Sequence, residues 1–370
     1  MAQDVVRNQR ADKGKMASLP AFCAARLALL ETQQAQRVLR EVPARLVSFA
    51  SNDYLGLSEH PEVVAAQAQS PAGACASRLV TGNHAHYTPL EAKLAAMKHA
   101  EAALVFGSGY LANLGTITAL MSAGDLVLAD KLAHACIIDG AQLSGATLKR
   151  FRHNDLAHAE ALLKEYRGQY KQVLIVTEHV FSMDGDCAPL PELAALAKRY
   201  DSWLMVDDAH GLFEEPPIAA DIWMGTLSKA AGAYGGYVTA KKSVTDYLAT
   251  TARSFIFSTG LPPATCAAAL KALEIITHEP ERRARPLALA KKVTQALNLP
   301  EAQSTIVPVI LGSSEAALNA AEALKKEGML VVAIRPPTVP PNTARLRLTF
   351  TTNHTDAQVD VLIAALRKIL

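Results

Sequence analysis

The chain has 370 residues, of which 50% are hydrophobic and 19% are charged, so it can bury a sizeable core and is not globally disordered. Its length suits two domains or one large α/β domain with appendages. Lys and Arg number 37 against 35 Asp and Glu, and a net charge of +2 is too small to indicate nucleic-acid binding.

The five cysteines indicate a reducing compartment. They are odd in number and form no Cys-x-x-Cys pair, which argues against a disulfide framework or a zinc finger, and we expect no metal site. Residues 1–15 lack the apolar stretch of a signal peptide, and no apolar run reaches the roughly eighteen residues that a membrane span needs. We therefore expect a cytoplasmic protein.

The first two thirds of the chain alternate between helical and strand patterns. Residues 19–41 have apolar side chains at helical spacing and precede Pro43, which predicts an N-terminal helix. Strands are predicted at 46–50, 103–106, 125–129, 147–151, 173–177 and 203–206. Helices are predicted from Thr88, which forms a capping box with Glu91, from near Tyr110, and at 191–200. This alternation predicts a mostly parallel sheet with helices on both faces.

The pattern changes at Pro262 and Pro263. A helical pattern runs to about residue 297, followed by predicted elements at 305–311 (strand), 315–327 (helix), 329–334 and 345–349 (strands) and 356–369 (helix). We therefore predict an N-terminal helical segment at 1–45, a large α/β domain at 46–262 and a smaller α+β domain at 263–370.

Three local features carry chemistry, although each has an ordinary structural explanation when taken alone. Asp207 follows a buried strand, where a carboxylate needs a cationic partner. The ordinary explanation is that it caps a helix or belongs to a structural ion pair. Lys229 lies among small residues that would let a ligand approach, although most lysines are simply on the surface. Residues 107–110, Gly-Ser-Gly-Tyr, join a strand to a helix whose free amides could hold an anion.

Together these features predict a site for pyridoxal phosphate (PLP). The lysine would hold the aldehyde as a Schiff base, the helix N-terminus would hold the phosphate, and the carboxylate would pair with the pyridinium nitrogen. A nicotinamide site fits less well, because residues 107–109 lack the third glycine of the dinucleotide-binding motif.

The chain resembles the α-oxoamine synthases, PLP-dependent enzymes of the aspartate-aminotransferase fold (fold type I). The motifs that carry the resemblance lie at 51–57 (Ser-Asn-Asp-Tyr-Leu-Gly-Leu), 181–186 (Phe-Ser-Met-Asp-Gly-Asp), 206–211 (Val-Asp-Asp-Ala-His-Gly), 334–340 (Ile-Arg-Pro-Pro-Thr-Val-Pro) and 344–348 (Ala-Arg-Leu-Arg-Leu). It extends from about residue 37 to the C-terminus. It implies a large domain with a mostly parallel central sheet and a smaller α+β C-terminal domain.

The resemblance also implies residue roles. The implied catalytic residues are Lys229, His134, Asp207 and His210. Those implied to bind the cofactor are Gly109, Tyr110, His134, Ser182, Asp207, His210, Thr226 and Lys229, with Ser258 and Thr259 reaching the phosphate of a neighbouring subunit in a homodimer. Those implied to bind substrate are Arg37, Asn52, Arg335 and Thr338, with Arg335 suited to a carboxylate because its guanidinium binds in a bidentate manner.

The motifs are most similar to family members that condense L-alanine with a pimeloyl thioester, carried by coenzyme A or by an acyl-carrier protein, in biotin biosynthesis. The alternatives are another α-oxoamine synthase, such as glycine C-acetyltransferase, a protein that keeps the fold without the chemistry, and, more remotely, an NAD-dependent enzyme. Two segments depart from the family pattern: 73–77 has alanine and cysteine in place of glycines, and 211–226 is shorter and lacks a glycine-rich loop.

Overall fold

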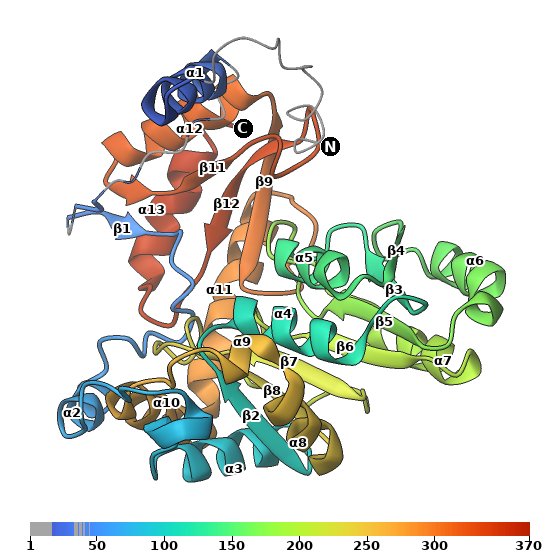
Figure 1. The fold of residues 1–370 in the computed structure, drawn as a ribbon. Coiled ribbons are helices and arrows are strands. Elements are labelled where there is room, and N and C mark those ends of the chain that lie inside the picture. The colour runs from blue at the N-terminus through green and yellow to red at the C-terminus, as the bar shows by residue number, and fades with distance from the viewer. Residues whose placement is uncertain (1–16, 33–35, 37–38, 40, 44) are drawn as a thin grey trace. The chain divides into compact units, whose positions relative to one another are not determined.

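The computed structural model describes residues 17–32, 36, 39, 41–43 and 45–370. Internal contacts divide the chain into two compact units (Figure 1). The larger unit contains 51–307 and 349–363, and the smaller unit contains 308–348, 364–370 and the described residues before 51. The domain ranges given above stay predictions.

The larger unit is built on a seven-stranded sheet with the strand order β2-β8-β7-β6-β5-β3-β4. The strands are β2 (Ala102–Phe106), β3 (Leu126–Asp130), β4 (Thr147–Phe151), β5 (Val173–Glu178), β6 (Trp203–Asp207), β7 (Ile222–Thr226) and β8 (Gly236–Ala240). The five strands from β7 to β4 are parallel, whereas β8 is antiparallel to both of its neighbours. The predicted mostly parallel sheet is therefore confirmed, and β7 and β8 are the two strands that the sequence patterns did not indicate.

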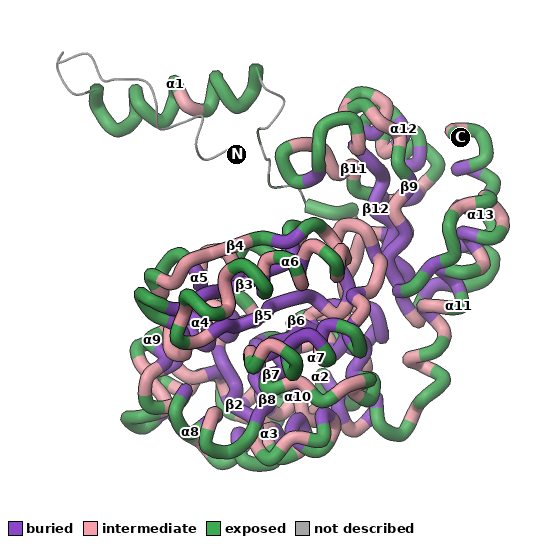
Figure 2. The backbone as a smooth tube through the Cα atoms, turned by 90° about the vertical axis from the view of Figure 1, so that its right-hand side faces the viewer, coloured by how far each residue is buried: buried purple, intermediate pink, exposed green. Residues whose placement is uncertain are grey.

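Helices cover both faces of this sheet, and the strands are the most buried part of the unit (Figure 2). One face packs against α4 (Gly109–Leu120), α5 (Ala135–Ser144), α8 (Lys242–Thr251) and α9 (Arg253–Ile256). The other face packs against α2 (Pro61–Ala68), α3 (Tyr87–Met97), α6 (Leu156–Tyr166), α7 (Leu190–Arg199) and α10 (Pro263–His278). The short helices η1 (Arg78–Gly82) and η2 (Arg167–Gln169) also belong to this unit.

The smaller unit contains most of a second, three-stranded sheet. Its strands have the order β11-β12-β9, with β11 (Val332–Ile334), β12 (Ala344–Thr349) and β9 (Ile306–Gly312), and a separate pair joins β1 (Val47–Ser48) to β10 (Met329–Leu330). The helices α1 (Leu19–Thr32) and α12 (Ser314–Lys326) also belong to it, and the last helix is α13 (Asp356–Leu366). No helix in the described part of the chain combines the length and the apolar composition that crossing a bilayer requires.

Three predicted helix boundaries are wrong. The first helix ends at Thr32, since residues 36, 39 and 41 are not helical, and no side chain of α1 is buried to support a longer helix. The pattern at 263–297 forms two helices, α10 and α11 (Pro280–Ala296), because Pro280 has no amide hydrogen to continue the first one.

The third concerns the predicted capping box. Helix α3 begins at Tyr87 without a side-chain cap. The carboxylate of Glu91 instead accepts a hydrogen bond from the Val105 amide in β2 (2.8 Å) and pairs with Arg78 (Nη2 to Oε2, 3.1 Å). Glu91 therefore accepts a hydrogen bond from an amide of the neighbouring strand instead of capping its own helix.

A buried ion pair lies just beyond the end of β6. Lys98 Nζ is 2.7 Å from Asp208 Oδ2, and the two side chains are only 2% and 3% exposed. The other oxygen of Asp208 is 2.7 Å from His179 Nδ1. Burial by itself raises the pKa of Asp208, but the charge of Lys98 and the contact with His179 outweigh it and lower the pKa.

Lys98→Met should therefore be strongly destabilising, because it leaves the Asp208 charge buried without its main partner. We expect the free energy of unfolding to fall by about 3 kcal/mol in urea titrations. The matched control is Lys164→Met, which breaks an exposed pair with Glu160 (3.0 Å) and should cost less than about 1 kcal/mol. Equal losses for the two variants would contradict this account.

A second, partly buried cluster holds His153 between two carboxylates. Its Nδ1 is 3.1 Å from Asp130 Oδ1 and its Nε2 is 2.8 Å from Asp186 Oδ2. Burial by itself lowers the pKa of His153, but the two carboxylates raise it from 6.5 to about 10.

This cluster should make stability depend on pH in the alkaline range. Since the pKa of His153 is higher in the folded chain, its stabilisation is complete below pH 6.5 and is lost as the pH rises through about 10. We expect the difference in unfolding free energy between the wild type and His153→Gln to shrink between these two pH values. A difference that stays constant over this range would show that the imidazole is not charged in the folded protein.

Candidate active site

The parallel strands β5, β6 and β7 end in polar residues at the same edge of the larger sheet. Glu178, Asp207 and Thr226 are the last residues of these strands, and Glu178 lies opposite Asp207 in the strand register. The carboxyl ends of parallel strands are where ligands bind in open α/β sheets.

A cavity of about 210 Å³ lies at this edge, and we call it the strand-end cavity. It is lined by Ser108, Gly109, Tyr110, Asn113, His134, Cys136, Glu178, Asp207, Ala209, His210, Met224, Thr226, Ser228 and Lys229. All four residues predicted to be catalytic thus meet at one cavity, together with three of those predicted to bind the cofactor: Gly109, Tyr110 and Thr226.

Lys229 lies in the connection between β7 and β8. Two backbone hydrogen bonds close this connection, from Leu227 N to Gly235 O (3.0 Å) and from Ala233 N to Leu227 O (2.9 Å). The Lys229 amine, Nζ, is 2.9 Å from His210 Nε2. The short closed loop therefore fixes the backbone from which the amine extends.

His210 is part of a hydrogen-bond chain that leads away from the amine. Its Nδ1 is 2.7 Å from the Tyr54 hydroxyl, which in turn donates to Asn52 Oδ1 (3.1 Å). With the hydroxyl proton on Asn52, His210 Nδ1 would donate to Tyr54 and the lone pair of Nε2 would face Lys229.

Two carboxyl groups are buried side by side in the cavity wall. Asp207 accepts hydrogen bonds from Asn113 Nδ2 (2.7 Å) and the Ala209 amide (2.9 Å). Burial raises the pKa of Asp207, although the charge of Lys229 and these bonds oppose it. Burial and the charge of Asp207 likewise raise the pKa of Glu178, whose Oε1 has no hydrogen-bond partner among the described residues. This wall favours a cation.

The opposite charge preference occurs at the N-terminus of α4. The Ser108 hydroxyl caps this helix by accepting from the Leu111 amide (3.2 Å), and the first amides of the helix belong to Gly109 and Tyr110. The hydroxyls of Thr226 and Ser228 are 2.8 Å apart and also line the cavity. Amides at a helix N-terminus together with hydroxyl groups form a binding site for a phosphate.

The side chain of Tyr110 has a partner in α5. Its hydroxyl donates to Asp139, and that bond raises the pKa of Tyr110 to about 12. The side chain of Tyr110 is therefore held by a neighbouring helix.

His134 is held at the start of α5. Its Nδ1 accepts a hydrogen bond from the Cys136 amide (3.2 Å), so the ring proton is on Nε2 when the ring is neutral. The backbone amides of His134 and Ser182 both donate to the Glu178 carboxylate. Glu178 thus joins two segments predicted to contact the cofactor, although Ser182 itself does not line the cavity.

The other predicted site residues lie elsewhere. Ser258 and Thr259 line a separate small hollow with Arg78 and Tyr87. Arg335 and Thr338 belong to the smaller unit, at and just after the end of β11. Arg37 is outside the described residues.

Sequence reasoning missed Glu178, Asn113 and Tyr54 as site residues. Glu178 ends an apolar strand just as Asp207 does, so the same signal could have revealed it. Asn113 and Tyr54 carry no such signal, since only the tertiary fold brings them to Asp207 and His210.

Known proteins are similar to this chain over most of its length. The family model for class I and II aminotransferases matches residues 44–366. An 8-amino-7-oxononanoate synthase of Methylorubrum extorquens is 56% identical over 366 residues, covering 94% of this chain and 95% of that protein. A protein of Phenylobacterium zucineum, named putative 8-amino-7-oxononanoate synthase, is 51% identical over 377 residues, covering 95% and 98%.

Solved structures show the same fold. Serine palmitoyltransferase of Sphingomonas wittichii superposes with a TM-score of 0.87 at 29% identity, covering 95% of this chain and 98% of that one. The 8-amino-7-oxononanoate synthase of Francisella tularensis superposes with a TM-score of 0.71 at 27% identity, covering 88% and 96%. These matches confirm the fold class predicted from the sequence, and the chain belongs to the family of class I and II aminotransferases.

Proposed function

We propose that this protein uses PLP to condense L-alanine with a pimeloyl thioester, releasing CO₂ and the free thiol and giving 8-amino-7-oxononanoate for biotin biosynthesis. The observation that carries the proposal is the single cavity in which Lys229, His134, Asp207 and His210 meet at the N-terminus of α4. The names of the curated relatives favour this reaction over that of a glycine C-acetyltransferase.

The donor groups of the strand-end cavity fit PLP. The N-terminus of α4 suits a dianionic phosphate, and the buried pair Glu178 and Asp207 suits a protonated ring nitrogen. Lys229 is the amine that can hold the aldehyde, and His134 would stack on the ring. When bound, PLP supplies an electron sink for the carbon that loses its proton.

The residues of this chain would position and move protons around that centre. The Lys229 amine, whose Nζ is 2.9 Å from His210 Nε2, would take the α-proton of alanine. His210 would accept a proton from that amine, and the Tyr54 contact fixes its orientation (2.7 Å). Asp207 would keep the ring nitrogen protonated, as its charge pairs with a cation.

Four further residues are proposed for the substrates. Arg335 would bind the carboxylate of alanine through its bidentate guanidinium, and Asn52 and Thr338 would line the substrate side. Arg37 would meet the acyl donor, whether coenzyme A or an acyl-carrier protein carries it. Cytoplasmic residence stays a prediction from cysteine usage.

A homodimer is proposed from an exposed apolar patch in the larger unit. Ser77 and Thr259 form a β-bridge, which places η1 beside the segment that follows α9. Leu79, Val80 and Phe257 on these two segments are 57%, 75% and 70% exposed. Clustered exposed apolar side chains mark interaction surfaces. Ser258 and Thr259, on the same segment, would then reach the phosphate site of the partner subunit.

Product formation from L-alanine and pimeloyl-coenzyme A, followed by mass spectrometry together with CO₂ release, tests the function. Lys229→Ala should lower the rate about a thousandfold by removing the base. The matched control Lys242→Ala replaces an exposed lysine paired with Asp246 and should leave the rate unchanged. Faster turnover of glycine with acetyl-coenzyme A would replace this proposal with the alternative synthase.

The dimer is tested by sedimentation velocity. Val80→Asp combined with Phe257→Asp should shift the protein to a monomer and weaken PLP binding, because charges would replace the apolar patch and Ser258 and Thr259 would lose their partner site. Ile310→Asp changes an exposed apolar residue of the smaller unit and should leave the dimer intact (Ile310 is 58% exposed). A wild-type monomer that binds PLP tightly would refute the shared site.

A further inference from the structure

The connection from β6 to β7 differs from the other parallel crossovers of the large sheet. The crossovers β3 to β4, β4 to β5 and β5 to β6 contain α5, α6 and α7 respectively. The β6 to β7 connection, residues 208–221, is fully described and contains no helix. Since a crossover helix normally covers the sheet, its absence leaves part of one face open.

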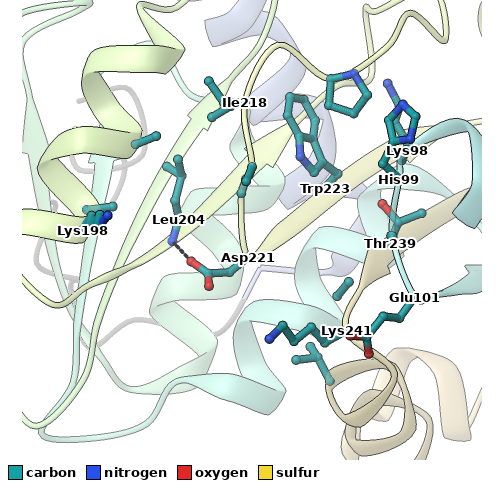
Figure 3. Close-up of a pocket in the computed structure, with 18 of the residues that line it drawn as sticks. Lys98, His99, Glu101, Lys198, Leu204, Ile218, Asp221, Trp223, Thr239 and Lys241 are labelled. Carbon is teal, nitrogen blue, oxygen red and sulfur yellow. Dashed lines mark hydrogen bonds between the residues drawn. The ribbon is translucent and has the colours of Figure 1, made fainter.

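A cavity of about 720 Å³ lies over this uncovered face (Figure 3). We call it the crossover cavity. Its floor contains Leu204, Trp223 and Thr239 from β6, β7 and β8, and its walls include Ala197 of α7 and Ile218 of the crossover. This volume is within the range of small-molecule sites. The cavity is at the amino-terminal ends of β6 and β7, whereas the strand-end cavity is at their carboxyl ends.

The floor contains one buried polar group without a partner. Thr239 is opposite Trp223 in the strand register, so both side chains are on the same face of the sheet. The residue is 1% exposed, and its Oγ1 forms no hydrogen bond with any described residue. A buried hydroxyl without a partner is unfavourable, so a ligand that bonds to it would gain affinity.

The rim contains two lysines that pair with no acid in the described part of the chain, Lys198 at the end of α7 and Lys241 just before α8 (Figure 3). The two rim carboxylates already accept backbone hydrogen bonds: Asp221 from the Leu204 amide (2.8 Å) and Glu101 from the Lys242 amide (3.0 Å). The two lysine charges are thus balanced by the two carboxylates, and the lysine amines are the rim donors left without an acid partner among the described residues.

The two other charged residues of the lining are also paired. Lys98 contacts Asp208 (2.7 Å), and His99 contacts Glu215 (3.0 Å). The cations left for an incoming ligand are therefore Lys198 and Lys241.

We propose that the crossover cavity binds an aliphatic carboxylate whose chain ends in a polar group. The carboxylate pairs with a rim lysine, Lys198 or Lys241, the chain packs against the apolar walls, and the terminal group bonds to the Thr239 hydroxyl. The proposal does not rest on the function proposed above, because it uses none of the residues of the strand-end cavity.

Isothermal titration calorimetry with 8-hydroxyoctanoate tests the proposal, with and without saturating PLP. We expect the same affinity in both cases. Lys198→Met combined with Lys241→Met should weaken binding at least about tenfold, through loss of charge-assisted bonds. The matched control, Lys325→Met with Lys326→Met on α12, should bind like the wild type. Equal affinity of the two double variants would overturn the proposal.

The role of Thr239 needs a second comparison. The wild type should bind 8-hydroxyoctanoate more tightly than octanoate, and Thr239→Val, which keeps the side-chain shape, should remove that preference while leaving the melting temperature no lower. Tighter binding of octylamine than of octanoate would show that Asp221 and Glu101 dominate the rim, and would also overturn the proposal.

Discussion

The candidate active site depends on the free-energy cost of burying carboxyl groups at the ends of β5 and β6. Glu178 and Asp207 are opposite each other in the strand register, so two carboxyl groups are buried together at one sheet edge. Neighbouring groups reduce that cost: Asn113 and the Ala209 amide donate to Asp207, and the charge of Lys229 acts on both carboxyl groups. The remaining demand for positive charge is what a protonated ring nitrogen would meet.

The sequence was most informative where the chemistry is local in the chain. Asp207 is the last residue of a buried strand, and Gly109 is the first residue of a helix, so both could be recognised without knowing the fold. Tyr54 is 156 residues away from His210, and only the folded chain brings them together. The predicted capping box of Thr88 and Glu91 was wrong because the Glu91 carboxylate bonds to a strand amide instead. The sequence of the helix alone does not show that this strand lies beside it.

The departures from the family pattern have physical consequences in the structure. Cys75 has a φ of 61°, a backbone conformation that glycine adopts without strain. In the glycine-poor segment 73–77, the side chain of Cys75 makes this conformation unfavourable. The segment 211–226 includes most of the connection at 208–221, which runs from the carboxyl end of β6 to the amino end of the neighbouring strand β7 without a helix. The same strands thus carry the proposed catalytic cavity at one end and an open apolar hollow at the other.

The loop that carries Lys229 limits how a reacting amine can move. Both of its ends enter antiparallel neighbours in the sheet, and Leu227 bonds across it to Gly235 and Ala233. The backbone therefore acts as a fixed pivot, and the amine travels only by rotation about the bonds of its own side chain. An insertion in this loop would displace the pivot itself, whereas a lysine analogue one methylene shorter would test reach alone.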